Sequence, residues 1–276
     1  MNTTEYVNTS GVNHFNADIR WDTISPDAFW SAADRVQEET LAQANAMFST
    51  LRTADPETLR ELLIQYRYFT VYYITDLALL IAGMEDGPMR SFLADILYDE
   101  LGCGKSNGAH PALYDKFLSS IGVDDRDLNS EALATNVALL DEARRRLVDP
   151  VNGSNYGIGL RGMGGECVCQ VYIAQLHAHL IDNPFIREHK DKIDWRFWDL
   201  HVGEHDIEHR EKTRALINTE VVARGGTGLE KLGLGYEYSM ESWRQFWINI
   251  FAIAEPAISR TADRKPVRGA VGLQIN

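Results

Sequence analysis

The sequence predicts an all-α protein, a bundle of seven or more helices without a sheet. Apolar residues recur at helical spacing through long segments, prolines and glycines mark most segment ends, and no stretch combines period-two alternation with hairpin turns. The 276 residues, 45% of them apolar and 24% charged, suit one globular domain large enough to enclose a cavity. We therefore expect a single helical domain over 1–276, with 1–25 as an arm or lid and 259–276 as a tail.

The first four expected helices carry recognisable start and stop signals. A Ser-Pro-Asp segment at 25–27 can begin the first helix, and an Asp-Pro pair at 55–56 caps the second with proline at its first position. The third opens at a Gly-Pro pair and stops at the glycine-rich segment 102–104. His110 precedes the proline that opens the fourth helix, which Gly122 terminates. The expected ranges are 26–51, 56–83, 88–101 and 112–121.

Four further helices are expected in the second half of the chain. Residues 130–148 are amphipathic, and 166–181 are almost entirely apolar, which predicts a central position. Residues 194–219 contain a cluster of histidines, and 240–258 are rich in aromatic residues. These two helices are expected to complete the bundle.

A glycine-rich segment, 153–165, precedes the central helix and is interpreted as a loop. Gly157, Gly159 and Gly162 match the G-x-G-x-x-G pattern of dinucleotide-binding folds, but no strand precedes them and no βαβ pattern surrounds them. We expect these glycines instead to let the helix that follows approach its neighbours closely.

Charge and cysteine content exclude several classes of protein. The net charge of −13 opposes binding to nucleic acid, and the one basic run, 144–146, lies near a helix end where cations are favoured. Cys103, Cys167 and Cys169 are too few and too irregularly spaced for a disulfide framework, which favours a reducing cytoplasm. Residues 1–18 are mostly polar and do not resemble a secretion signal, and the most apolar run, 69–84, is interrupted by polar residues, so no membrane span is expected.

One nine-residue stretch of the expected helix 194–219 contains six side chains that can bind metal. They are His201, Glu204, His205, Asp206, Glu208 and His209. Imidazole and carboxylate ligands together suit iron, manganese or zinc better than calcium or magnesium. The stretch therefore predicts one wall of a metal site.

Three residues from other helices extend this metal site. Glu100 and Glu166 lie on helices that are otherwise apolar on their buried sides, where an unpaired carboxylate is costly. Together with His110 and the histidine cluster, they would come from four separate helices, which is how bundle proteins surround two metal ions. Taken singly, Glu100 could be an exposed residue at a helix end, and His110 could simply precede a proline.

These residues and the sequence around them resemble the haem-oxygenase-like diiron oxidases and oxygenases over about 59–217. The resemblance is carried by Glu100, His110 ten positions on, Glu166, the histidine-rich helix, and the segments YDELGCG at 98–104 and FLSSIG at 117–122. It implies a haem-oxygenase-like bundle that binds two iron ions, with Glu166 bridging them and O₂ as co-substrate. The implied reactions are N-oxygenation, desaturation or carbon-carbon cleavage in specialised biosynthesis, with no catalytic residue beyond the metal ligands.

The histidine-rich helix departs from the H-x-x-x-D-x-x-H spacing of that family. In a regular helix His201, His205 and Glu208 would share one face and be the ligands. One extra residue accommodated in a π-bulge would instead bring together His201, Asp206 and His209. We favour the second set because it keeps the family's ligand types, and His205 then becomes an auxiliary ligand.

The remaining predictions concern an additional metal ligand, the substrate, and alternative functions of the protein. Asp76 is either an additional metal ligand or a buried, hydrogen-bonded aspartate. Arg161 or Arg210 could bind a substrate carboxylate, and a small amine or amino acid is favoured over a fatty acid. The alternatives are a haem-handling or cofactor-independent protein on the same scaffold, and a metal-binding protein without catalysis. A small-molecule substrate is the expected partner, and a homodimer is possible.

Overall fold

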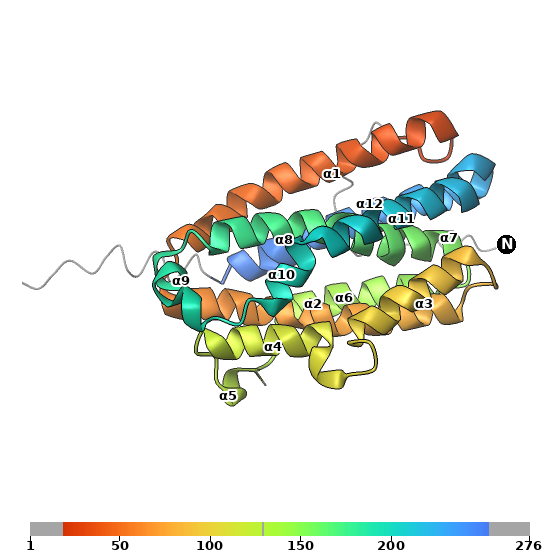
Figure 1. Ribbon diagram of the computed structural model, residues 1–276. Helices are drawn as coiled ribbons and strands as arrows, with labels where there is room; N and C mark the ends of the chain where they lie inside the picture. Colours follow the sequence, from red (N-terminus) through yellow and green to blue (C-terminus); the bar gives the residue numbers. More distant parts are fainter. Residues whose placement is uncertain (1–18, 129, 254–276) are drawn as a thin grey trace, which may run out of the picture.

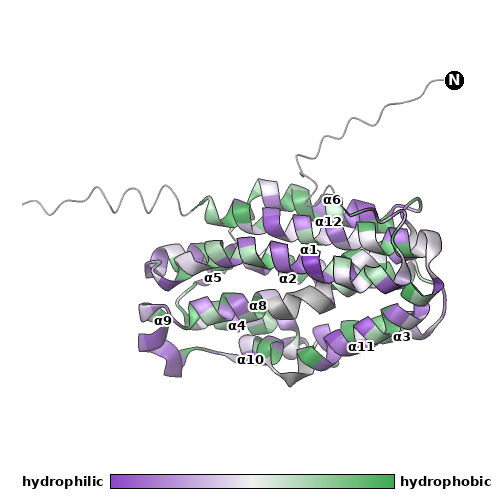
Figure 2. Ribbon diagram, turned by 90° about the horizontal axis from the view of Figure 1, so that it is seen from above, coloured by the Kyte–Doolittle hydropathy of each residue, from purple (hydrophilic) through white to green (hydrophobic). Residues whose placement is uncertain are grey.

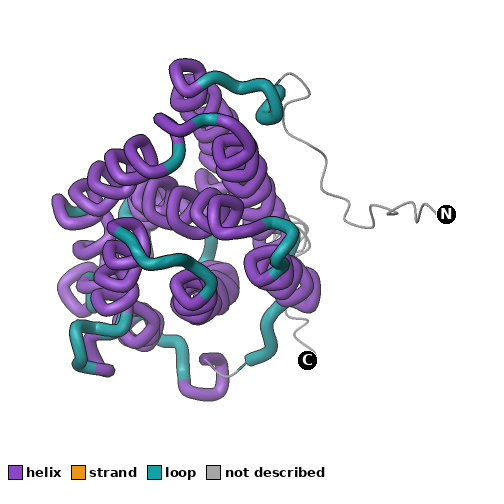
Figure 3. The backbone as a smooth tube through the Cα atoms, turned by 90° about the vertical axis from the view of Figure 1, so that its right-hand side faces the viewer, coloured by secondary structure: helices purple, strands orange, loops and turns teal. Residues whose placement is uncertain are grey.

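The computed structural model describes residues 19–128 and 130–253, except for the side chains of 167–171 and 204–206. In these ranges the chain forms twelve α-helices, several short 3₁₀-helices, one π-helical segment and no strand, so the predicted all-α class is confirmed (Figure 1). The long helices lie lengthwise beside one another, as the view along the bundle shows (Figure 3). None of the described helices combines the length and apolarity needed to cross a membrane.

The first half of the chain follows the predicted helix starts closely. The Ser25 hydroxyl accepts a hydrogen bond from the Ala28 N–H, and the Asp55 carboxylate accepts from the N–H groups of Glu57 and Thr58. These caps start the two longest helices of this half. The helices are α1 (Pro26–Phe48), α2 (Pro56–Ala82), α3 (Pro88–Glu100), α4 (His110–Ser120), the short and unexpected α5 (Asp125–Leu128), and α6 (Ala134–Val148).

The core is rich in aromatic side chains. Phe69 of α2 packs against Trp243 with ring centroids 4.2 Å apart, and Tyr66 stacks on Trp247 at 5.3 Å. Both tryptophans belong to α12 (Gly226–Phe251), so α2 and α12 meet through aromatic pairs. Most helices carry both hydrophilic and hydrophobic residues, as expected for a bundle with one interior (Figure 2).

The glycine-rich segment is helical, so its interpretation as a loop was wrong. It forms α7 (Gly153–Gly157) and a π-helical segment (Ile158–Glu166) that leads directly into α8 (Cys167–Leu180). A side chain at Gly159 would collide with the Leu232 carbonyl, and one at Gly235 with the Tyr156 carbonyl. Glycine normally disfavours helix, but here it permits backbone contact with α12. The predicted close approach of these glycines is therefore confirmed.

The expected helix 194–219 is two helices, α10 (Arg196–Val202) and α11 (Glu204–Glu220), separated by Gly203. Gly203 has an extended backbone with ψ of −177°, and a Cβ there would lie 2.8 Å from the Asp199 carbonyl oxygen. The structure therefore contains neither the regular helix nor the π-bulge that the sequence suggested at this place. Another short helix, α9 (Pro184–His189), precedes α10 and was not expected.

The ends of the chain differ from expectation where they are described. α12 begins at Gly226, well before the expected start at 240, because Gly233 leaves room for the Trp21 ring and Gly235 for the backbone of Tyr156. Trp21, in the expected arm, is buried and donates a hydrogen bond from Nε1 to Glu237 at 2.9 Å. The rest of the arm, 1–18, and the tail, 259–276, lie outside the described residues.

Candidate metal centre

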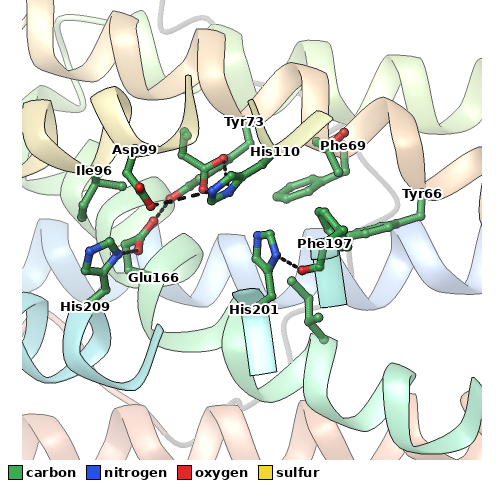
Figure 4. Close-up of a pocket in the computed structure, with 13 residues that line it drawn as sticks. Tyr66, Phe69, Tyr73, Ile96, Asp99, His110, Glu166, Phe197, His201 and His209 are labelled. Carbon is green, nitrogen blue, oxygen red and sulfur yellow. Dashed lines mark hydrogen bonds and ion pairs between the residues drawn. The ribbon is translucent and has the colours of Figure 1, made fainter. Parts of the chain in front are cut away.

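A pocket of about 30 Å³ lies between α2, α3, α4, the π-helical segment, α8, α10 and α11 (Figure 4). This volume is enough for one or two groups the size of a water molecule. Its lining combines acidic, imidazole and aromatic side chains: Tyr66, Phe69, Thr70, Tyr73, Ile96, Asp99, Glu100, His110, Glu166, Ile173, Phe197, His201 and His209. The structure therefore brings together five residues predicted as ligands, Glu100, His110, Glu166, His201 and His209.

Glu100, His110 and His201 form one side of the pocket. Glu100 ends α3 and His110 begins α4, and Nδ1 of His110 lies 2.9 Å from a Glu100 oxygen. The ring of His201 lies 4.7 Å from that of His110, between centroids. One possible ligand atom from each of the three residues lies within 4.8 Å of the other two. This spacing suits a single metal ion between them.

Gly102 makes this arrangement possible because the loop between α3 and α4 turns sharply there. Its φ is +79°, and a Cβ would lie 2.5 Å from the backbone nitrogen of Ala109. Any other residue at this position would strain the loop. Gly102, which helped to predict the end of the third helix, therefore also lets the loop place His110 opposite Glu100.

His201 is held in the form that a metal ligand requires. Its Nδ1 donates a hydrogen bond to the Phe197 carbonyl at 2.7 Å, which leaves the lone pair on Nε2. Complete burial, and then the proximity of His110, lower the pKa of His201 to about 4. The imidazole is therefore neutral at physiological pH.

Glu166 and His209 form the other side of the pocket. Glu166 is the last residue of the π-helical segment, and its Oε2 lies 3.8 Å from Nδ1 of His209 on α11. The hydroxyl of Tyr73, on α2, donates a hydrogen bond to the other oxygen, Oε1. In Figure 4 Glu166 and His209 lie next to each other and come from separate helices.

Two of the additional candidate ligands lie elsewhere. Glu208 is exposed and pairs with Lys212, 3.6 Å away on the same helix, because it projects from the outer side of α11. Asp76 is completely buried and pairs with Arg144 at 2.7 Å and with Arg161 at 2.7 Å. The regular-helix set that included Glu208 is therefore not assembled, and Asp76 follows the second alternative, a buried and hydrogen-bonded aspartate.

The other residues that were predicted for the site differ in where the structure places them. Arg161 is buried and its guanidinium is held by Asp76, and neither Arg161 nor Arg210 lines the pocket described above. The side chains of His205 and Asp206, both predicted as ligands, lie outside the described residues. Of the π-bulge set, His201 and His209 do line one pocket, although a break at Gly203 and not a bulge separates them.

Asp99 and Tyr73 line the pocket but were not predicted from the sequence as site residues. Asp99 precedes Glu100, and its Oδ2 lies 3.7 Å from Nε2 of His110. Tyr66, Phe69, Thr70 and Tyr73 all line the pocket and follow an i, i+3, i+4, i+7 pattern on α2. That pattern was the available signal for Tyr73, since it shows that these residues share one helix face.

The donor set fits iron. Nitrogen and oxygen donors are mixed, His201 is neutral with one nitrogen available, and no lysine or arginine is among the described residues that line the pocket. A cation bound there would offset the burial of Glu100 and Glu166. Glu100, His110 and His201 would hold one ion, and Glu166 and His209 would contribute to a second.

The fold is that of a known class of helical protein. The chain is similar to the crystal structure of a TenA homolog from Pseudomonas syringae pv. tomato str. DC3000, with a TM-score of 0.65 and 15% identity. The match covers 87% of this chain and 100% of that chain. It confirms the haem-oxygenase-like bundle expected from the sequence. No curated protein matches the sequence.

The sequence pattern of a family described as iron-containing redox enzymes matches residues 60–237. This range covers well over half of the chain and includes every residue that lines the pocket. The chain belongs to the iron-containing redox enzyme family. The expectations of iron and of redox activity are confirmed at this level.

Proposed function

We propose that this protein is a non-haem diiron enzyme that uses O₂ to oxidise a small amine or an amino-acid-like substrate. The observation that carries the proposal is the presence of two acid–imidazole groups in one pocket. Glu100, His110 and His201 form the first, and Glu166 and His209 form the second. A single ion would leave one of the two half-buried carboxylates, Glu100 or Glu166, without a metal cation.

The bound ferrous ions would supply the electrons that reduce O₂, and the protein's own residues place and shield them. Phe69 and Phe197 form apolar walls that limit the entry of water. The hydrogen bond from His201 to the Phe197 carbonyl fixes the ring orientation, so Nε2 stays directed for binding.

The described lining of the pocket contains no group that would anchor a substrate carboxylate. Asp99, Glu100 and Glu166 line it, and its described lining includes no arginine or lysine to bind a carboxylate. Arg161 is held by Asp76 and is not available as the carboxylate anchor that the sequence suggested. An amine fits this lining, and Asp99, which belongs to neither proposed group of metal ligands, is the acid that could face it.

The test is an anaerobic titration of the protein with ferrous iron, followed by exposure to O₂ and a panel of amines and amino acids. We expect two irons per chain and a transient visible absorption band that decays faster with a substrate. An intact fold that binds no iron would contradict the proposal and favour a cofactor-independent protein. Iron uptake without O₂-dependent turnover would instead indicate a metal-binding protein without catalysis.

A Glu166→Ala variant provides the matched control for the iron titration. We expect it to lose at least one iron while the helical content by circular dichroism is retained, because a metal ligand in a large bundle is rarely the main source of stability. Full iron loading in this variant would contradict a ligand role for Glu166.

A further inference from the structure

Tyr73 lines the pocket but is not one of the proposed metal ligands. Its side chain is buried with 5% exposure, and its hydroxyl donates to Oε1 of Glu166. The second oxygen of that carboxylate, Oε2, is the one that faces His209. The two oxygens of Glu166 therefore have different partners from different helices.

The placement of Tyr73 is built into the fold by the glycine next to Glu166. A Cβ at Gly165 would lie 2.5 Å from Cε2 and 2.7 Å from Cζ of the Tyr73 ring. Only glycine lets the ring lie against the backbone one residue before the carboxylate that it contacts. Phe69 stacks on the other part of the ring at 5.8 Å and 19°, which fixes its plane.

We propose that Tyr73 is a positioning residue that occupies Oε1 of Glu166 and leaves Oε2 as the oxygen that binds the ion shared with His209. This inference rests on the proposed function, since it assumes an ion at that place. The hydrogen bond then fixes which oxygen of Glu166 faces that ion, and Oε1 keeps a second lone pair for a metal contact of its own.

The hydrogen bond also explains why a buried carboxylate can be held in one orientation before metal binds. A carboxylate that accepts a hydrogen bond from a rigid donor loses less rotational freedom when it binds an ion. Removal of such a partner from a metal ligand typically lowers metal affinity about 10–100-fold. The effect of Tyr73 is therefore measurable without any turnover.

The test is anaerobic titration of the full chain with Co²⁺ alone, with affinity and the visible spectrum as readouts. Tyr73→Phe keeps the stacked ring and removes only the hydroxyl. We expect it to weaken one Co²⁺ site about 10–100-fold and to change the visible bands of that site, because the carboxylate of Glu166 is no longer held in one orientation. Tyr72→Phe is the matched control, since the Tyr72 hydroxyl bonds Asp141, away from the pocket.

Each outcome separates this inference from the proposed function. A wild-type chain that binds no Co²⁺ and no iron would overturn both. Wild-type binding of two ions with unchanged affinity and spectrum in Tyr73→Phe would overturn only the role of Tyr73. Gly165→Ala is a second variant that displaces the ring and keeps the hydroxyl, and we expect the same direction of change. If Tyr73→Phe does not fold by circular dichroism, a wild-type spectrum in Gly165→Ala would overturn the inference.

Discussion

Two groups of charged residues lie about one helical turn apart along α2, beside Asp76 and beside Tyr73, and they differ in their counter-ions. Asp76 is paired with Arg144 and Arg161, so its charge is balanced by protein cations. Near Tyr73, the pocket contains three acids and three histidines but no lysine or arginine among its described residues. The first group is a structural ion cluster, and the second has the composition of a site for metal cations.

The same two segments supply both groups. α2 contributes Tyr73 and Asp76, and the π-helical segment contributes Glu166 and Arg161. The Asp76–Arg161 ion pair therefore joins α2 to the π-helical segment close to the point where Tyr73 contacts Glu166. The difference teaches that burial of a carboxylate does not by itself indicate a metal ligand, because the partners decide its role.

The largest expected effect is on the ion cluster. Asp76→Asn removes the carboxylate that both arginines contact and leaves Arg161 buried without a counter-ion. Breaking a buried ion pair in this way costs about 3–5 kcal/mol, and we expect that loss in the free energy of unfolding measured with urea. Asp141→Asn, at an exposed position, is the control. A loss below about 1 kcal/mol for Asp76→Asn would contradict the distinction between the groups.

The next largest effect is on metal binding. Glu100→Gln removes the charge that faces His110 and His201, and we expect iron affinity to fall about 100-fold or more, which corresponds to about 2.7 kcal/mol. Without metal, the free energy of unfolding should change little, because glutamine keeps an oxygen facing His110 and Asp99 stays beside the same imidazole. Glu85→Gln, which is exposed, should change neither quantity. A large loss of metal-free stability would show that Glu100 belongs to a structural cluster.

A smaller effect is expected at the outer arginine of the ion cluster. The Arg144 side chain is 29% exposed, and Asp76 keeps Arg161 when Arg144 is removed. We expect Arg144→Met to lower the free energy of unfolding by about 1 kcal/mol in urea denaturation and to leave iron affinity unchanged. A loss as large as that of Asp76→Asn would mean that Arg144, and not Arg161, is the main counter-ion.

The smallest effect is expected on the exposed side of α11. Glu208→Ala removes only a surface ion pair with Lys212, so the stability change should stay below about 0.5 kcal/mol and iron affinity should not change. His209→Ala, one residue later, should weaken iron binding in the anaerobic titration with ferrous iron, because His209 lines the pocket. Equal weakening by both substitutions would restore the ligand set that includes Glu208.

Much of the fold was predictable because its signals are local. Proline and cap residues marked the starts of α1, α2, α3 and α4, and the structure begins these helices there. Three features were missed. The helical form of 153–166 and the early start of α12 involve tertiary contacts, whereas at the break the carbonyl nearest to Gly203 is that of Asp199, four residues earlier. In each case a glycine lies where another part of the backbone or a large ring approaches it.

The site was predictable to the extent that residue type revealed it. Glu100, His110 and Glu166 stood out because acids and histidines are unusual in apolar surroundings, and the structure brings them into one pocket. Asp99 and Tyr73 did not stand out, since an aspartate at a helix end and a tyrosine in a core are both ordinary. Asp76 was ambiguous because its arginine partners are distant in sequence, at 144 and 161.

The paired glycines between α12 and the segment around 153–166 have one further consequence. Gly159 faces the Leu232 carbonyl and Gly235 faces the Tyr156 carbonyl, so two main chains interlock without intervening side chains. Such a joint cannot absorb an added methyl group by rotamer adjustment, and the main chain itself would have to shift. We therefore expect a replacement at Gly235 to displace the π-helical segment that ends at Glu166, although Gly235 lies on a different helix.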